Sequence, residues 1–138
     1  MGIKTAALAA ALSIGMAGCS TTPVSADKAK PVPKERLYGF QQQPAESFGT
    51  AVVTRDSGFT GSACYVLLRI DGVKAAEFGT AETATFYLKP GDSIMEIDSG
   101  ICGGGNKEIE VKSLAGESRR YRIFLDSTSG YGLSRTTY

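Results

Sequence analysis

The sequence contains no histidine among its 138 residues. Histidine is the usual general base beside catalytic serines and cysteines, and it is the commonest protein ligand of transition metals. Its absence excludes Ser-His-Asp and Cys-His catalysis and most metal sites, so we expect no catalytic residue, no metal site and no cofactor. The sequence also lacks any stretch that keeps a helical period of apolar residues over ten positions, which argues against a helical domain.

Charge of one sign is not in excess either. The chain holds 15 lysines and arginines against 14 aspartates and glutamates, and residues 1–18 contain one of those lysines and no acidic residue. A protein that binds nucleic acid ordinarily presents a basic patch to the phosphates. We therefore expect no nucleic-acid partner.

No apolar run is long enough to span a bilayer, which needs about 20 residues. Residues 5–16 form a short uncharged run rich in alanine and leucine, and a lysine stands just before it at position 4. A positive start followed by a short apolar run is typical of a secretory signal peptide.

This run ends in Met-Ala-Gly-Cys at 16–19, which resembles the lipobox of bacterial lipoproteins. The resemblance implies that residues 1–18 are a lipoprotein signal peptide and that Cys19 carries a diacylglycerol on its sulfur and an acyl chain on its amine. Two or three acyl chains hold a protein on a membrane, so the membrane is an expected partner through Cys19. The alternative is an ordinary signal peptide with a chance cysteine. Ser20, rather than an aspartate, follows Cys19; in the enterobacterial sorting rule this favours the periplasmic face of the outer membrane over the inner membrane.

Residues 19–44 are rich in proline, lysine, serine and glutamine. Such a composition buries too little apolar area to offset chain entropy, so this segment is predicted to be a flexible tether ahead of a domain at 45–138. Leu37, Tyr38 and Phe40 are the exception, because three large apolar groups in four residues are rarely left in water. They either form a first edge strand on the domain or bind a partner.

The remaining residues, 45–138, predict one all-β domain. Short segments rich in valine, isoleucine, threonine and tyrosine alternate with turn residues at intervals of about ten positions, which is typical of a sandwich. We expect a small antiparallel β-sandwich of seven or eight strands. The candidate strands are 50–55, 63–70, 73–78, 82–88, 93–97, 107–112, 119–125 and 133–137.

Two turn signals mark where the strands reverse. Asp71-Gly72 is a strong hairpin signal, because glycine accepts the positive φ of a type I′ turn, and Pro90-Gly91 marks another reversal. Strict alternation along the strands then predicts which side chains face inward. These are Cys64, Val66, Leu68, Ile70, Ala84, Phe86, Leu88, Met95, Ile97, Ile109, Val111, Tyr121, Ile123 and Leu125.

The segments "RIDGVKAAEF" at 69–78 and "YLKPGDSIMEI" at 87–97 resemble the small β-sandwich of PEGA-type and related uncharacterised domains of proteobacterial lipoproteins. Those domains share a strand, an Asp-Gly-like turn, a second strand and a Pro-Gly turn that opens another strand. The likeness covers residues 63–97, and this chain differs by its cysteines and by Asp92 after the Pro-Gly pair. The resemblance implies a noncatalytic envelope module without catalytic residues.

The stretch "SGICGGGNKE" at 99–108 admits three interpretations, namely a phosphate loop, a reactive thiol and a turn held by a disulfide. A Walker-type loop needs lysine and then a hydroxyl residue directly after its second glycine. Here Asn106 precedes Lys107, and Glu108 stands where the hydroxyl residue belongs. We therefore expect no nucleotide.

The cysteine of this stretch, Cys102, has one obvious partner. With Cys19 lipidated, Cys64 is the other remaining cysteine, and two cysteines in a small exported domain most simply pair. We expect a Cys64–Cys102 disulfide that closes about 39 residues. A reactive thiol would need a nearby base or a second cysteine two residues away.

Candidate binding residues lie near the carboxyl end. Arg119, Arg120 and Arg122 fall within one expected strand, where they either bind a sugar acid or phosphate or form a solvated strand face. Tyr131 either stacks on a sugar or belongs to a closing edge strand.

Two classes of function remain. The sequence favours a lipid-anchored lipoprotein of the cell envelope that acts as a noncatalytic binding or accessory module for an envelope protein or for secretion or adhesin machinery. The alternative is a lipoprotein that binds peptidoglycan or another glycan. A cell-wall hydrolase is less favoured still, because no motif supports it.

Overall fold

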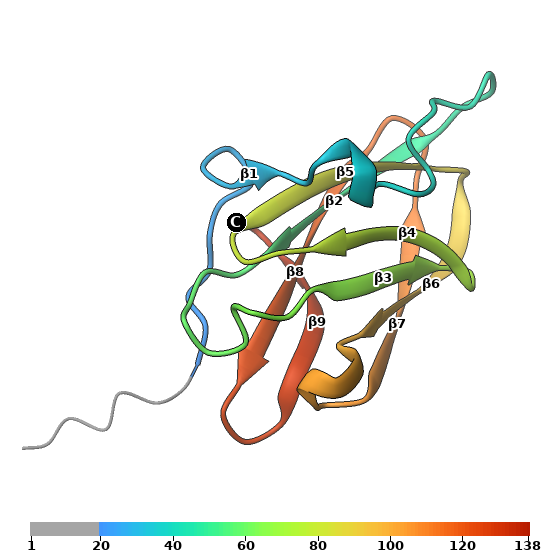
Figure 1. Cartoon of the computed structure of the whole chain (residues 1–138). Coiled ribbons are helices and arrows are strands. Elements are labelled where there is room, and N and C mark those ends of the chain that lie inside the picture. The colour runs from blue at the N-terminus through green and yellow to red at the C-terminus, as the bar shows by residue number, and fades with distance from the viewer. Residues whose placement is uncertain (1–19) are drawn as a thin grey trace, which may run out of the picture.

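The computed structural model describes residues 20–138, so the predicted signal peptide and the lipidation site at Cys19 lie outside the described residues. Nine strands form two sheets that pack face to face around one core (Figure 1). This confirms the predicted all-β sandwich. Two short 3-10 turns, η1 (Lys34–Arg36) and η2 (Gly100–Cys102), are the helical elements of the described part. Within residues 20–138, no helix has the length and apolar character needed to cross a membrane.

The first sheet has the strand order β1-β5-β2-β8-β9. Its central strand, β2, lies antiparallel to β5 and parallel to β8, and β1 runs parallel to β5. The strands are β1 (Lys30–Pro31), β2 (Gly49–Arg55), β5 (Glu82–Leu88), β8 (Ser118–Asp126) and β9 (Gly130–Thr136).

The second sheet has the order β4-β3-β6-β7, and all of its neighbouring strands are antiparallel. Its strands are β3 (Val66–Ile70), β4 (Val73–Phe78), β6 (Gly91–Asp98) and β7 (Asn106–Ser113). The hairpin between β3 and β4 turns at Asp71 and Gly72, whose φ angles are 49° and 77°. Both are left-handed, as the predicted type I′ turn requires.

The core lies between the sheets and follows the alternation of the strands. Val53, Phe86 and Ile123 of the first sheet are fully buried, as are Leu68 and Met95 of the second. The side chains of these five residues meet in one apolar cluster. Each residue faces inward because successive strand residues point to opposite faces of a sheet.

Three residues predicted to face inward are only partly buried, namely Cys64, Ile109 and Leu125. Cys64 precedes β3, Ile109 lies on the edge strand β7, and Leu125 lies next to the turn between β8 and β9. Fewer neighbours surround a side chain at such positions. The remaining predicted inward-facing residues are buried.

All eight predicted strands are present, and their ends differ from the predicted ends by no more than three residues. The ninth strand, β1, was not predicted. The parallel pairing of β2 with β8 is also a departure from the antiparallel expectation. It is possible because the whole second sheet, together with β5, lies between β2 and β8 in the chain, which supplies the long crossover that parallel neighbours need.

The prediction of a flexible tether over 19–44 is wrong for the described part of that segment. The Thr21 N–H donates to the Leu125 carbonyl at 3.0 Å, and Thr22 exchanges two backbone hydrogen bonds with Ser57 at 2.8 and 3.0 Å. The chain is therefore attached to the sandwich from its second described residue.

Further along, residues 30–41 close one open side of the sandwich, where they run between the edges of the two sheets (Figure 1). On the second sheet, the Tyr38 N–H donates to the Ala75 carbonyl of β4 at 2.9 Å. On the first sheet, the Tyr87 N–H of β5 donates to the Phe40 carbonyl at 2.9 Å. The segment thus covers strand edges that would otherwise present free backbone groups to other chains.

The apolar side chains of this segment also join the core. Val32 is 4% exposed, and Leu37 and Phe40 pack against the buried cluster. Of the two interpretations of Leu37, Tyr38 and Phe40, docking on the domain is the one observed for the first and third residues. Tyr38 remains 47% exposed.

Arg36 fastens the same segment by an ion pair. Its guanidinium donates to both carboxylate oxygens of Glu82 at 2.7 Å and to the Glu77 carbonyl at 2.9 Å, and it lies 4.4 Å from the ring centre of Tyr65. Burial disfavours the ionised form of Glu82, but the hydrogen bonds from Arg36 and from the Gly79 N–H outweigh it and lower the pKa of that carboxyl. Such bidentate pairs are among the stronger polar contacts.

We predict that Arg36→Ala lowers the free energy of unfolding of residues 20–138 by about 2 kcal/mol, the usual contribution of hydrogen bonds to charged groups. Urea unfolding monitored by circular dichroism measures the change. Because the pKa of Glu82 is lowered in the folded state, the pair stabilises above the unfolded pKa of about 4.3 and is lost as the pH falls through the folded value. The difference between parent and variant should therefore shrink at acidic pH.

Lys34→Ala is the matched control, because Lys34 lies on the same turn and is exposed. We expect its effect to stay within about 0.5 kcal/mol. Equal effects of the two substitutions would contradict the role given to Arg36.

Candidate functional site

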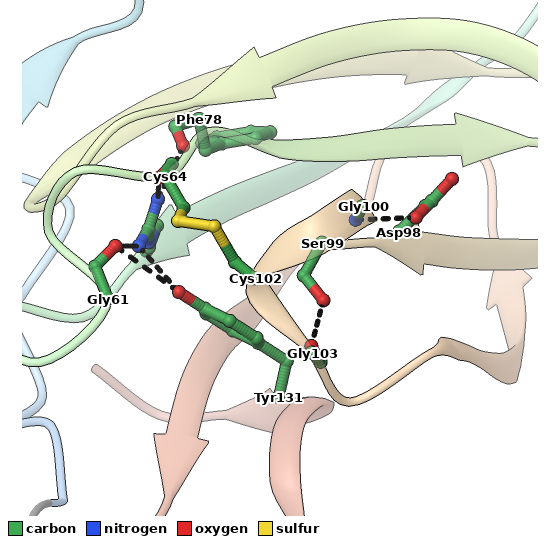
Figure 2. Close-up of a disulfide and its surroundings, with 10 residues drawn as sticks. Gly61, Cys64, Phe78, Asp98, Ser99, Gly100, Cys102, Gly103 and Tyr131 are labelled. Carbon is green, nitrogen blue, oxygen red and sulfur yellow. Dashed lines mark hydrogen bonds between the residues drawn. A yellow bond between two sulfur atoms is a disulfide. The ribbon is translucent and has the colours of Figure 1, made fainter.

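A disulfide joins Cys64 and Cys102, as the sequence predicted (Figure 2). Their Cα atoms are 6.3 Å apart, within the range that a disulfide bridges without backbone movement. The bridge connects loop 56–65, between β2 and β3, with loop 99–105, between β6 and β7. These two loops, together with the β8–β9 turn at 127–129, form one end of the sandwich, which we call the loop end.

The glycine-rich loop 99–105 is a packed turn. The Ser99 hydroxyl, in a residue only 4% exposed, donates to the Gly103 carbonyl within the loop (Figure 2). Gly104 has a φ of 94°, and a Cβ at this position would lie 3.0 Å from the backbone nitrogen of Tyr131. Glycine is required here both for the left-handed backbone and for the close approach of β9.

Close to the bridge, within hydrogen-bond distance of the Cys64 carbonyl, lies Arg55, the last residue of β2, which is only 4% exposed. Its guanidinium donates to the carbonyls of Gly61 at 2.7 Å and Phe78 at 2.8 Å, and also to the carbonyl of Cys64. A further bond of 3.1 Å reaches the hydroxyl of Tyr131, whose ring centre lies 5.5 Å from the guanidinium carbon. Figure 2 shows how these acceptors converge.

The acceptors around Arg55 are all uncharged, and within residues 20–138 it forms no ion pair. Burial lowers its pKa, but arginine starts so far above neutrality that it stays protonated. A cation taken out of water is tolerated only when its donors are bonded. The loop end is therefore built around a buried positive charge that backbone carbonyls and one phenol solvate.

Arg55 was not among the predicted site residues, although the sequence carried a signal for it. Ala51 and Val53 are buried residues of β2, and a period of two places Arg55 on the same inward face. A cation at an inward position predicts a cluster of acceptors around it.

The three predicted binding arginines do not form one site. Arg122 pairs with Asp56, whose carboxylate is nearly inaccessible and also accepts a 2.8 Å bond from the Thr21 hydroxyl. Arg119 pairs with Glu117 at 3.1 Å, on the opposite face of β8. Arg120 is exposed. Two of the three thus have structural partners, and alternation along β8 places Arg119 on the face opposite Arg120 and Arg122.

Tyr131 is 2% exposed, and its hydroxyl lies between Arg55 and the Gly61 carbonyl. A buried ring cannot stack on a sugar, so that interpretation is wrong. The alternative is the one observed, because Tyr131 lies on the edge strand β9.

The loop end also exposes large apolar side chains. Phe59 is 94% exposed and Tyr65 57%, and the side chain of Ile101 is fully in solvent. A shallow cavity of about 600 Å³ beside the disulfide is lined by Tyr65, Leu67 and Ile101, among others. Exposed apolar groups gathered at one end of a small domain mark a surface suited to contact with a partner or a membrane.

The second candidate surface lies at the opposite end of β2. A groove of about 670 Å³, which we call the far-end groove, is formed where residues 37–44 meet residues 87–93 and Asp71. Its walls are fixed in place. The Gln41 side chain donates to the Thr85 carbonyl at 3.1 Å, and the ring of Tyr87 packs edge-on against Phe48 with 5.4 Å between ring centres.

The polar groups of the far-end groove suit binding. Tyr38 and Gln42 present a phenol and an amide, and Lys89 contributes an exposed ammonium group. The two carboxylates that line the groove are already engaged within the second sheet. Asp71 accepts the Ile94 N–H at 2.8 Å, and Asp92 lies 3.7 Å from Lys112. A concave wall of tyrosine, proline and amide groups is typical of a binding groove.

We predict that Tyr131→Phe lowers the free energy of unfolding of residues 20–138 by about 1 to 2 kcal/mol, because it leaves one donor of the buried Arg55 without its phenol acceptor. Tyr138→Phe is the matched control, since Tyr138 is 55% exposed. Urea unfolding of both variants compares them. An unchanged Tyr131→Phe protein would show that the phenol contributes nothing to the solvation of Arg55.

We predict that replacing both Cys64 and Cys102 by alanine costs about 4 kcal/mol, the chain-entropy value for a closed loop of 39 residues. Denaturant unfolding of the oxidised parent, the reduced parent and the double variant measures the cost. The reduced parent should resemble the double variant. If the reduced parent kept the stability of the oxidised one, the bridge would have no stabilising role.

Comparison with protein-family models, with curated proteins and with solved structures found no match for this chain.

Proposed function

We propose that this chain is a lipid-anchored lipoprotein of the bacterial cell envelope that binds a protein partner and catalyses no reaction. Cys19 carries the lipid, the membrane is the first partner, and the periplasmic face of the outer membrane is the favoured location. The far-end groove holds an exposed loop or extended segment of the second partner, an envelope protein or a component of secretion or adhesin machinery.

The observation that carries this proposal is the position of the far-end groove. The chain attaches to the sandwich at Thr21, beside the loop end, whereas the groove lies at the other end of β2. A seven-residue strand spans roughly 20 Å at about 3.3 Å per residue. An anchor at Cys19 would therefore leave the groove facing away from the membrane and open to a partner.

The chemistry of the groove supports binding over catalysis. The Tyr38 hydroxyl donates to the Glu77 carboxylate at 3.0 Å. The pKa of Tyr38 is raised, first by partial burial and then by this hydrogen bond, so the phenol stays protonated. A protonated phenol is a hydrogen-bond donor and a flat apolar surface, which are properties that protein interfaces favour.

The second candidate function, binding of peptidoglycan or another glycan, is favoured by the same side chains. Tyr38 and Tyr87 offer rings, and Gln42 and Lys89 offer polar groups, on one wall. The two candidates differ in what the groove retains, a protein or the insoluble wall.

Site-directed photocrosslinking in cells tests the proposal. A photoreactive amino acid replaces Gln42, which lines the groove and is exposed, in the full-length chain. The control position is Glu110, which is exposed on the edge strand β7 outside the groove. We expect one discrete protein adduct from position 42 and none from position 110, and we expect Tyr38→Ala to remove the adduct while the chain stays folded.

The outcomes separate the candidates. Adducts of equal intensity from both positions would contradict a groove-specific partner. Recovery of the chain with purified sacculi, lost with Tyr38→Ala and without any protein adduct, would replace the protein partner by the glycan.

A further inference from the structure

We infer that loop 57–62 docks on the same bilayer that holds the lipid of Cys19, with the ring of Phe59 inserted at the membrane interface. The inference rests on the proposed lipid anchor and extends it, because it makes the loop end a membrane-binding surface and fixes the orientation of the whole domain.

Almost no free chain separates the proposed anchor at Cys19 from the first residue that is bonded to the sandwich, Thr21. Thr21 bonds to Leu125 through both backbone and side chain, with its N–H donating at 3.0 Å and its hydroxyl accepting at 2.9 Å. The same hydroxyl donates to the buried carboxylate of Asp56 at 2.8 Å. Ser20 is therefore the single residue between Cys19 and a firmly bonded position.

The distance from Thr21 to Phe59 is also short. A Cβ added to Gly58 would lie 3.4 Å from the Thr21 Cα, and Phe59 is the next residue. Because consecutive Cα atoms are about 3.8 Å apart, the Cα atoms of Cys19 and Phe59 are at most about 16 Å apart. A lipid on Cys19 inserted in a leaflet thus keeps Phe59 within reach of the headgroups and the outer acyl chains.

The chemistry of the loop also favours the inference. Phe59 is 94% exposed, and residues 57–63 contain serine, glycine, threonine and alanine but no charged residue. The Ser62 N–H donates to the Phe59 carbonyl at 3.0 Å, which closes the turn that carries the ring. Insertion of this turn would bury one large apolar side chain without removing a charge from water.

Electrostatics determines the kind of membrane. Asp126 lies at the same end, and hydrogen bonds from the Thr128 hydroxyl and from the backbone of Thr128 and Ser129 lower its pKa to about 2. Asp98 adds a second carboxylate, which Arg69 partly balances at 3.6 Å. These carboxylates lie nearer the surface of the loop end, whereas the positive charge of Arg55 there is buried, so the attraction of this end to a bilayer is apolar and does not require anionic lipid.

Tryptophan fluorescence tests the inference directly, because the natural chain contains no tryptophan. The full lipidated chain is reconstituted in phosphatidylcholine vesicles as Phe59→Trp. The matched control is Val73→Trp, which reports on a side chain that is 55% exposed beside the distant β3–β4 turn. We expect only the Phe59→Trp protein to show emission at shorter wavelength, quenching by brominated lipid and protection from acrylamide.

If the Phe59→Trp protein stays as open to acrylamide on vesicles as in solution, the inference is wrong. Quenching of both variants by brominated lipid would also overturn it, because the domain would then lie on the membrane without a preferred orientation.

A second arm separates this inference from the proposed lipid anchor. Mass spectrometry of the amino-terminal peptide establishes whether Cys19 is lipidated, which decides the anchor itself. Independently, residues 20–138 with Ser20→Cys are coupled to a maleimide lipid, since the other two cysteines are joined in the disulfide. Membrane contact of Phe59→Trp in this form supports docking of loop 57–62 beside a lipid anchor at this end of the chain, and its absence overturns the inference even where Cys19 is lipidated.

Discussion

The burial of the Arg55 guanidinium is the constraint on which the loop end depends. A cation withdrawn from water must have its donors bonded, and the acceptors here come from loop 56–65, from the end of β4 and from β9. Any movement of one of these segments would leave a buried charge without a partner, which costs far more than one ordinary hydrogen bond. The Cys64–Cys102 bridge adds a covalent connection between loop 56–65 and loop 99–105, next to this buried charge. Loops that expose apolar residues are in this way held in one shape.

The amino-terminal segment gives the domain two different ends. Its first residues bond near the loop end, and it then follows the sheet edges to the far-end groove, to which it contributes residues 37–44. One segment therefore seals the side of the sandwich, fixes the attachment point of the chain and forms a wall of the groove. This arrangement suits a domain that is anchored at one end and binds a partner at the other.

Sequence reasoning predicted the strands, the turns and the disulfide because these depend on local pattern. Alternation and turn residues act over a few positions, and the two cysteines left only one pairing. It failed where distant backbone groups decide the structure. The tether composition gave no indication that Thr21 bonds to Leu125, because backbone hydrogen bonds leave no trace in residue type. The far-end groove was likewise hidden, since residues 37–44 and 87–93 converge only in three dimensions. Arg55 was recoverable, because alternation along β2 places it inward beside Val53.

The fastening of Thr21 also has a consequence for the order of events during synthesis and export. Its partner Leu125 lies 104 residues later in the chain, and Arg122, which pairs with the carboxylate that Thr21 also contacts, lies on the same late strand. Contacts of such long range form late, because the chain must first close a large loop. Until β8 has emerged and paired with β2, the bonds of Thr21 to Leu125 cannot form, and only those of Thr21 and Thr22 to Asp56 and Ser57 are available. Under the proposed lipid anchoring, enzymes that cleave and acylate this site would have their best access during that interval, so maturation and folding would compete in time for the same few residues.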